Sequence, residues 1–196
     1  NTPYSQFVRA ELTLSRTWIF GSNSGQSIAA RLLAGAGHAY GNSTSLPFEK
    51  HFYAGGANSL RGWQARTVGP GLSPMDKSFV IPNQTGDMRL EANIEYRFDL
   101  FWKLAGAVFI DAGNIWTLKD DNTEDGRLAM FRWDTFAESI AANWGVGLRL
   151  NFGFLLLRLD AGMKVHDPAR EVKWVNPGQW LDTENYALHF GVGYPF

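Results

Sequence analysis

Apolar and polar residues alternate strictly along several stretches of the chain. The clearest stretch is residues 86–100, GDMRLEANIEYRFDL, in which every second residue from Asp87 to Asp99 is charged or an amide. The residues between them, from Met88 to Leu100, are all apolar or aromatic. Successive side chains of a strand point to opposite faces, so this stretch predicts a strand with one apolar and one polar face. It is longer than the usual strand of about five or six residues and can supply the roughly 9–11 tilted residues that cross a bilayer.

The same alternation predicts six further strands. They cover residues 7–17, 27–38, 104–116, 143–152, 155–165 and 186–196. The links between the predicted strands alternate in length, with short links at 21–26, 99–103 and 153–154 and long ones at 39–86, 117–142 and 166–185. Short turns at one end and long loops at the other are typical of outer-membrane barrels, whose short turns face the periplasm. The predicted fold is therefore all-β, an antiparallel transmembrane β-barrel.

The odd number of predicted strands needs an explanation. Bacterial single-chain barrels have an even number of strands and leave no open edge in lipid. Either an eighth strand lies within residues 44–54, or the chain is part of a larger barrel. We favour the second interpretation and expect residues 1–196 to form a single domain, the C-terminal segment of an outer-membrane β-barrel. The isolated chain would then self-associate through its open strand edges or close into a smaller, non-native barrel.

Composition narrows the chemistry that the chain can perform. Lys plus Arg is 18 and Asp plus Glu is 19, and this near-zero net charge indicates no nucleic-acid partner. The absence of cysteine excludes disulfides and thiolate metal sites. No apolar run approaches the about 18 residues of a membrane helix. The first residues have neither the basic start nor the apolar core of a signal peptide, so we expect a mature chain or one cut from a longer protein.

Catalytic and metal-binding patterns are missing from the sequence. The histidines, which lack any metal-ligand spacing, are His38, His51, His166 and His189. There is no G-x-S-x-G nucleophile motif. The acidic cluster of Asp120, Asp121, Glu124 and Asp125 lacks EF-hand spacing, and we interpret it as a solvated loop rather than a calcium site. In the same loop, residues 133–142 predict one or two helical turns capped by Asp134 or Thr135. We expect no metal, no cofactor and no enzymatic activity.

The first long loop carries the most specific motif of the chain. Its residues follow the pattern G-G-x-x-S-[VLI]-R-G-[FYW], and the matching positions are Gly55, Gly56, Ser59, Leu60, Arg61, Gly62 and Trp63. This motif resembles the loop signature of the BamA/TamA superfamily, the bacterial surface antigen family of outer-membrane barrels that insert or translocate other proteins. VFIDAGNIW at residues 108–116 resembles the family's F-x-D-x-G strand motif, and NIEYRF at 93–98 resembles the strand before it. The resemblance covers nearly the whole chain, as about seven or eight strands of about sixteen.

The resemblance also implies partners for the loop arginine. In the family this arginine pairs inside the lumen with carboxylates on the next two strands, which are Glu95 and Asp111 here. Alternation by itself places Glu95 on the polar face of its strand, and Asp111 lies between Ile110 and Ala112 and should point inward. A buried guanidinium among carboxylates makes forked, charge-assisted hydrogen bonds. The alternative is that Arg61 is a solvated loop residue.

The final residues carry a second pattern. The sequence HFGVGYPF resembles the terminal signal by which outer-membrane barrels are recognised during assembly, and its positions are His189, Gly191, Tyr194 and Phe196. Alternation predicts that Tyr194 and Phe196 lie on the apolar face of the last strand, and Pro195 removes one ladder donor. In the family this strand forms a weak seam with the first strand, the lateral gate.

The resemblance implies a non-enzymatic outer-membrane protein assembly or insertion factor in the bacterial outer membrane. Its partners would be outer-membrane lipid, unfolded outer-membrane protein clients and accessory assembly proteins. Two alternatives stay open. One is a pore of the two-partner secretion type, and the other is a small independent outer-membrane pore or adhesin.

Overall fold

The computed structural model confirms an all-β, antiparallel architecture. It describes residues 4–21, 25–74, 84–119 and 122–196. Across these residues one seven-stranded sheet has the order β1-β2-β3-β4-β5-β6-β7, so that every strand pairs with its neighbours in sequence. The strands are β1 (Phe7–Phe20), β2 (Gln26–Ala39), β3 (Met88–Phe101), β4 (Leu104–Trp116), β5 (Ala141–Asn151), β6 (Leu156–His166) and β7 (Tyr186–Val192).

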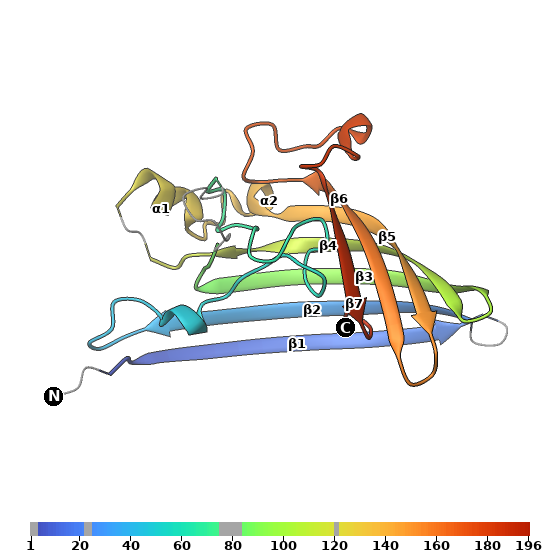
Figure 1. Cartoon of the computed structure of the whole chain (residues 1–196). Coiled ribbons are helices and arrows are strands. Elements are labelled where there is room, and N and C mark those ends of the chain that lie inside the picture. The colour runs from blue at the N-terminus through green and yellow to red at the C-terminus, as the bar shows by residue number, and fades with distance from the viewer. Residues whose placement is uncertain (1–3, 22–24, 75–83, 120–121) are drawn as a thin grey trace.

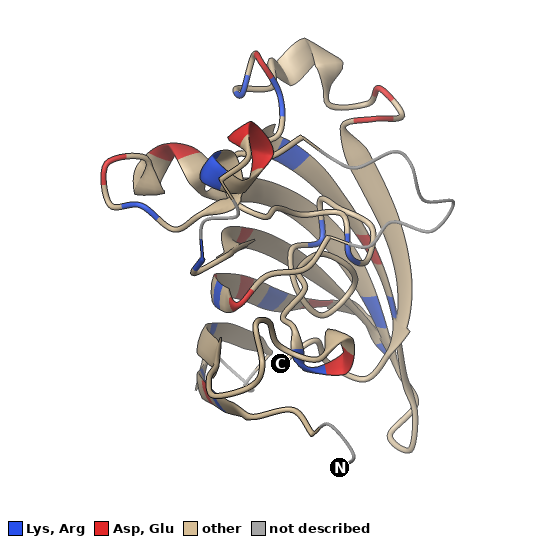
Figure 2. Cartoon of the chain, turned by 90° about the vertical axis from the view of Figure 1, so that its left-hand side faces the viewer, with Lys and Arg blue, Asp and Glu red and all other residues tan. Residues whose placement is uncertain are grey.

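The sheet curves into an open trough. Strands β1 to β4 lie side by side, and β5 to β7 turn over towards the viewer, so that the loop between β2 and β3 lies in the hollow (Figure 1). The view along the strands shows the sheet curving around this loop (Figure 2). In the described sheet β1 and β7 are its two edges and do not pair with each other. The trough is therefore an arc of a barrel wall with the long loop inside it.

The outward face of the sheet is an apolar belt. Large apolar side chains on every strand are exposed there: Leu12, Leu14, Leu32, Ile94, Val108, Ile110, Val146, Leu148, Leu159, Leu188 and Phe190. Aromatic residues gather at the short-turn end of the strands: Phe20, Phe101, Trp102 and Phe154. An apolar band with an aromatic girdle is the surface that a membrane barrel presents to lipid. Polar residues that alternate with the belt on β3 to β7 are buried on the concave side, whereas β1 is exposed on both faces.

An eighth strand within residues 44–54 is not formed. This part of the chain instead contains the short 3-10 helix η2 (Phe48–Lys50) and two isolated β-bridges, Phe52 with Gly86 and Ala54 with Val68. The segment turns into the trough because β2 has glycines on its inner face there. A Cβ at Gly35 would lie 2.5 Å from the Phe52 ring, so only a glycine leaves room for that ring.

The last strand is shorter than the alternation predicts. It ends at Val192, and the prediction that Tyr194 and Phe196 continue its apolar face is wrong. Gly193 has a φ of 81°, a conformation that favours glycine, and Pro195 has no N–H to donate to a ladder. The aromatic rings instead meet arginines of the concave side, with the Arg97 guanidinium 4.2 Å from the Tyr194 ring centroid. Attraction between a cation and an aromatic face favours this position over the lipid side.

Short helices lie in the long loops at the other end. Helix α2 (Phe136–Ser139) follows Thr135, as expected, although the backbone N–H of Thr135 bonds the Asp134 carboxylate and no side chain caps the helix. Helix α1 (Glu124–Ala129) was not expected. Thr123 caps it by accepting from the Gly126 N–H at 2.9 Å, and the first turn of the helix is acidic, which suits its positive end.

Two members of the acidic cluster, Asp120 and Asp121, lie outside the described residues. The 3-10 helix η3 (Pro177–Gln179) lies in the last loop, and no helix in the described ranges is long and apolar enough to cross a membrane.

Candidate functional site: the loop held in the trough

The motif glycines shape a compact turn in the loop. Gly55 and Gly56 have φ values of 95° and 97°, which disfavour any residue with a Cβ. The turn closes on itself through hydrogen bonds from the Gly56 N–H to the Trp63 carbonyl at 2.9 Å and from the Ser59 N–H to the Gly56 carbonyl at 3.0 Å. The Gly55 N–H also donates to the Ser59 hydroxyl at 2.9 Å. The motif thus determines the backbone that presents Arg61 to the sheet.

Apolar side chains fix one side of this turn to the wall. The cluster contains Phe52, Ala54, Leu60, Trp63, Val68, Ile115 and Ala141. Leu60 is fully buried and Trp63 is 4% exposed, so the motif positions on both sides of Arg61 and Gly62 are core residues. Gly62 itself touches β5, because a Cβ there would lie 2.6 Å from the Cβ of Asn143. The loop is therefore packed against the wall rather than suspended in solvent.

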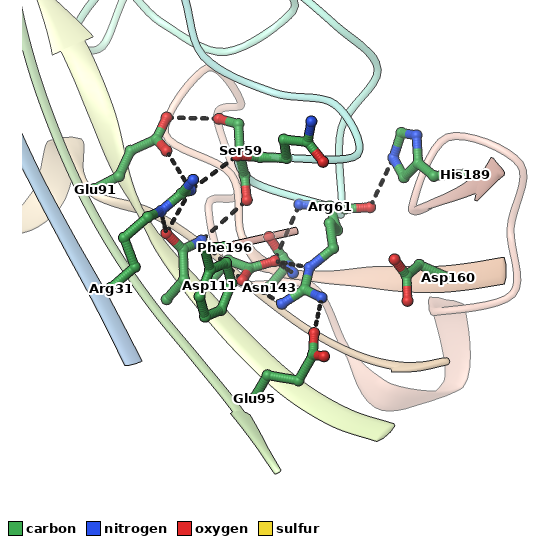
Figure 3. A network of polar contacts seen from close by, with 12 residues as sticks. Arg31, Ser59, Arg61, Glu91, Glu95, Asp111, Asn143, Asp160, His189 and Phe196 are labelled. Atoms are coloured by element: carbon green, nitrogen blue, oxygen red, sulfur yellow. Dashed lines mark hydrogen bonds and ion pairs between the residues drawn. The ribbon is translucent and has the colours of Figure 1, made fainter. Parts of the chain in front are cut away.

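Arg61 joins two strands of the wall. Its guanidinium donates to both oxygens of Asp111 on β4, from Nε to Oδ2 at 3.0 Å and from Nη2 to Oδ1 at 2.9 Å. Its Nη1 forms an ion pair with Glu95 on β3, and its backbone N–H donates to Asp111 at 3.1 Å (Figure 3). The guanidinium carbon lies 3.5 Å from the centroid of the Phe109 ring. Arg61 is 1% exposed and both carboxylates are fully buried, so these groups compensate one another's charge away from bulk water.

The two carboxylates have further partners. Glu95 accepts from Arg97 at 2.7 Å and from Arg149 at 3.0 Å. Asp111 accepts from the side-chain amides of Asn93 at 2.9 Å and Asn143 at 3.0 Å. Burial alone would lower the pKa of the Arg61 guanidinium, but the carboxylates of Asp111 and Glu95 outweigh burial and raise that pKa above its usual range. Arg61 is therefore cationic at every accessible pH.

A second polar group binds the other end of the turn. The Ser59 hydroxyl donates to Glu91 on β3 at 2.5 Å, and the backbone carbonyl of Ser59 accepts from the Asn93 side chain at 3.0 Å. Glu91 also pairs with Arg31 of β2 at 3.3 Å and with Arg89 at 2.8 Å. The loop is therefore hydrogen-bonded to β3 at three points, Glu91, Asn93 and Glu95, that lie on the same face of one strand (Figure 3).

Sequence reasoning missed several members of this network. They are Arg31, Glu91, Asn93, Asn143, Arg149, Arg158 and Asp160, all of them on inward positions of their strands. The signal that could have found them is the alternation itself, which puts each on the polar face. What alternation does not give is which strand positions lie at the same height, because this depends on the register between strands.

The residues of the C-terminal pattern are divided between two places. The His189 imidazole on β7 donates from Nε2 to the backbone carbonyl of Arg61 at 3.1 Å. Gly191 lies beneath the Arg158 side chain, where a Cβ would be 2.5 Å from Nε. Phe196 lies 5.0 Å from the Arg31 guanidinium, whereas Tyr194 meets Arg97. The structure thus brings His189 and Phe196 to the loop.

The arrangement is suited to anchoring rather than to bond-breaking chemistry. The described residues contain no group of three His, Cys, Asp or Glu side chains that could hold a metal ion. The network consists of carboxylates neutralised by arginines and amides, which hold a backbone segment in place. A lipid-facing curved sheet with a polar interior and a loop bound inside it defines a transmembrane barrel with an internal loop.

Comparisons with known proteins give the family. The Omp85 superfamily domain matches residues 4–196, and the chain belongs to this superfamily. The outer membrane protein assembly factor BamA of Neisseria meningitidis serogroup B is 27% identical over 132 residues, which cover 62% of this chain and 16% of the relative. The resemblance to the BamA/TamA superfamily is confirmed, as is a location in the bacterial outer membrane.

Solved structures share the fold at low sequence identity. BamA from Haemophilus ducreyi lacking POTRA domains 1-3 superposes with a TM-score of 0.66 at 16% identity, over 96% of this chain and 35% of that chain. CdiB from Acinetobacter baumannii superposes with a TM-score of 0.53 at 13% identity, over 97% of this chain and 27% of that chain. The chain therefore spans about a third or less of the length of these relatives.

Proposed function

We propose that this chain is a single domain, the C-terminal segment of an outer-membrane protein assembly or insertion barrel that works without enzymatic chemistry. The described part of the loop between β2 and β3, residues 40–74 and 84–87, would act as an internal support of the wall, and β7 would form one side of a lateral gate. Its partners would be outer-membrane lipid, unfolded outer-membrane protein clients and accessory assembly proteins. The Neisseria relative, whose name describes it as an assembly factor, supports this proposal.

The observation that carries the proposal is that Arg61 is buried and ion-paired inside the trough. A solvated loop arginine would have no reason to be 1% exposed and bonded to carboxylates of two strands. Burying three charged groups is costly unless they compensate one another, so a loop held in this way is a built part of the wall. The loop fills the inside of the barrel arc, and an interior filled in this way is unsuited to a wide passive pore.

The test uses the full-length protein that contains this chain, reconstituted into liposomes. An unfolded outer-membrane barrel is added as client, and its insertion is followed by protection from protease. Insertion that is faster than in protein-free liposomes, and slower again with the Arg61→Ala variant, is the expected result. Equal insertion rates with and without the protein would refute the proposal.

A second candidate is a translocation pore of the two-partner secretion type, and the fold likeness to CdiB favours it. The same liposomes separate the two functions if a soluble unfolded substrate replaces the barrel client. Transfer of that substrate into the lumen, without client insertion, would support the pore. An ion conductance with neither activity would favour a small independent pore or adhesin.

A further inference from the structure

The backbone of the motif turn contacts the last two strands as well as β3 and β4. Gly162 of β6 lies directly under the Arg61–Gly62 peptide, and a Cβ at Gly162 would overlap the Arg61 carbonyl oxygen. On the neighbouring strand, His189 of β7 donates to that same carbonyl at 3.1 Å. His189 is opposite Asp160 in the β6–β7 register, so its ring stands over the inner face of the sheet (Figure 3). One peptide group of the loop therefore touches both strands.

Arg158 of β6 makes a second contact from the same side. Its side chain crosses over Gly191 of β7 and donates from Nη2 to the side-chain oxygen of Asn58. The backbone carbonyl of Asn58 in turn accepts from Arg31 of β2 at 2.8 Å. Asn58 is thus bonded to a strand on each side of the trough, β2 and β6. A side chain at position 191 would displace Arg158 from this path.

From these contacts we propose that residues 58–62, here called the brace, hold β7 at a fixed distance from β3 and β4, and that His189 and Arg158 are the positioning residues of this contact. On one side of the brace, the Arg61 guanidinium binds Glu95 of β3 and Asp111 of β4. On the other side, the Arg61 carbonyl binds His189 of β7 and the Asn58 side chain binds Arg158 of β6. The inference rests on the proposed function, in which movement of β7 opens the gate.

The physical consequence follows from how weakly β7 is otherwise held. Among the described residues β7 pairs with β6 alone, and at seven residues it is half the length of β1. Its outer side chains Leu188, Phe190 and Val192 contact no other part of the described chain closely enough to be buried. The brace therefore opposes outward movement of β7 together with the β6 ladder and with the arginine contacts of Tyr194 and Phe196. β7 cannot move outward without breaking the bond from His189.

Hydrogen exchange of the full-length protein in lipid nanodiscs tests the brace. His189→Ala is expected to speed exchange of the β7 amides by about three- to tenfold, the factor that corresponds to one net neutral hydrogen bond. Exchange in β1 to β3 should stay unchanged. His189→Gln, whose amide can donate to the same carbonyl, should restore slow exchange in β7. His38→Ala, at an exposed position of β2, is the matched control.

A double variant tests whether the effect runs through the loop. If Arg61→Ala releases the brace, β7 should exchange as fast as in His189→Ala, and adding His189→Ala to it should change nothing further. Unchanged β7 exchange in His189→Ala would overturn the inference, as would the same acceleration in all strands. The exchange experiment does not depend on client insertion, so failure of the proposed function and failure of the brace can be told apart.

Discussion

Replacing Arg61 by alanine should release the loop from the wall, and the structure indicates how much stability is lost. The variant leaves Glu95 paired with Arg97 and Arg149, so that carboxylate stays compensated. Asp111 keeps only the amide donors of Asn93 and Asn143, and Arg61 is its one ion-pair partner among the described residues. Removing one partner of a buried pair costs about 3–5 kcal/mol, and the two remaining amides put the expected loss near the lower end, about 3 kcal/mol.

A loss of about 3 kcal/mol raises the population of the released loop by about a hundredfold. Hydrogen exchange of the amides of residues 59–63, measured on the full-length protein in nanodiscs, reports this population directly. Arg61→Lys should be intermediate, because an ammonium cannot make the forked contact with Asp111. Arg132→Ala, which breaks an exposed pair with Asp134 in another loop, is the control and should change little.

The double variant Arg61→Ala, Asp111→Asn sharpens the test. Asparagine removes the uncompensated charge, so the double variant should be more stable than the sum of the two single losses predicts. Wild-type exchange rates in Arg61→Ala, or strict additivity in the double variant, would refute the account of Asp111 as the carboxylate left without a cation.

Three further outcomes follow from the packing. Phe52→Ala should lower the free energy of unfolding by about 3–5 kcal/mol, measured by denaturant titration, whereas Phe154→Ala at a 90% exposed position should not. Gly62→Ala places a methyl group against Asn143 and should cost about 1–3 kcal/mol in the same titration. The isolated chain, whose β1 and β7 edges are open, should form oligomers in detergent or close into a smaller barrel. Light scattering that shows a stable monomer of native barrel diameter would contradict both.

Local patterns determined much of this fold. Alternation alone predicted all seven strands, and β4 begins and ends at the predicted residues. This works because a strand in a barrel wall has lipid on one side and a polar interior on the other, so the polarity of each residue indicates the face on which it lies. The same logic put Glu95 and Asp111 inward before any pairing between strands was known.

Predictions failed where the chain leaves the sheet. Residues 44–54 have some strand-like character but fill the trough, because Gly35 and Gly37 of β2 leave space for Phe52 and Leu46. The end of β7 follows Gly193 away from the ladder towards Arg97, an arginine that lies far from it in the sequence. Neither outcome can be read from local alternation, since each depends on a partner that only the tertiary structure provides.

The sequence by itself therefore determined the strands, their faces, the family and the motif that contains Arg61. The family resemblance also implied Glu95 and Asp111 as the partners of Arg61. Only the tertiary structure decided which other inward residues meet them. The register of six strand pairs sets Glu95, Asp111, Asn143 and His189 around one loop, and Gly162 of β6 leaves space for that loop to approach. The physical reason is that side-chain orientation is a local property of the strand, whereas charge compensation in a buried site needs several strands at one height.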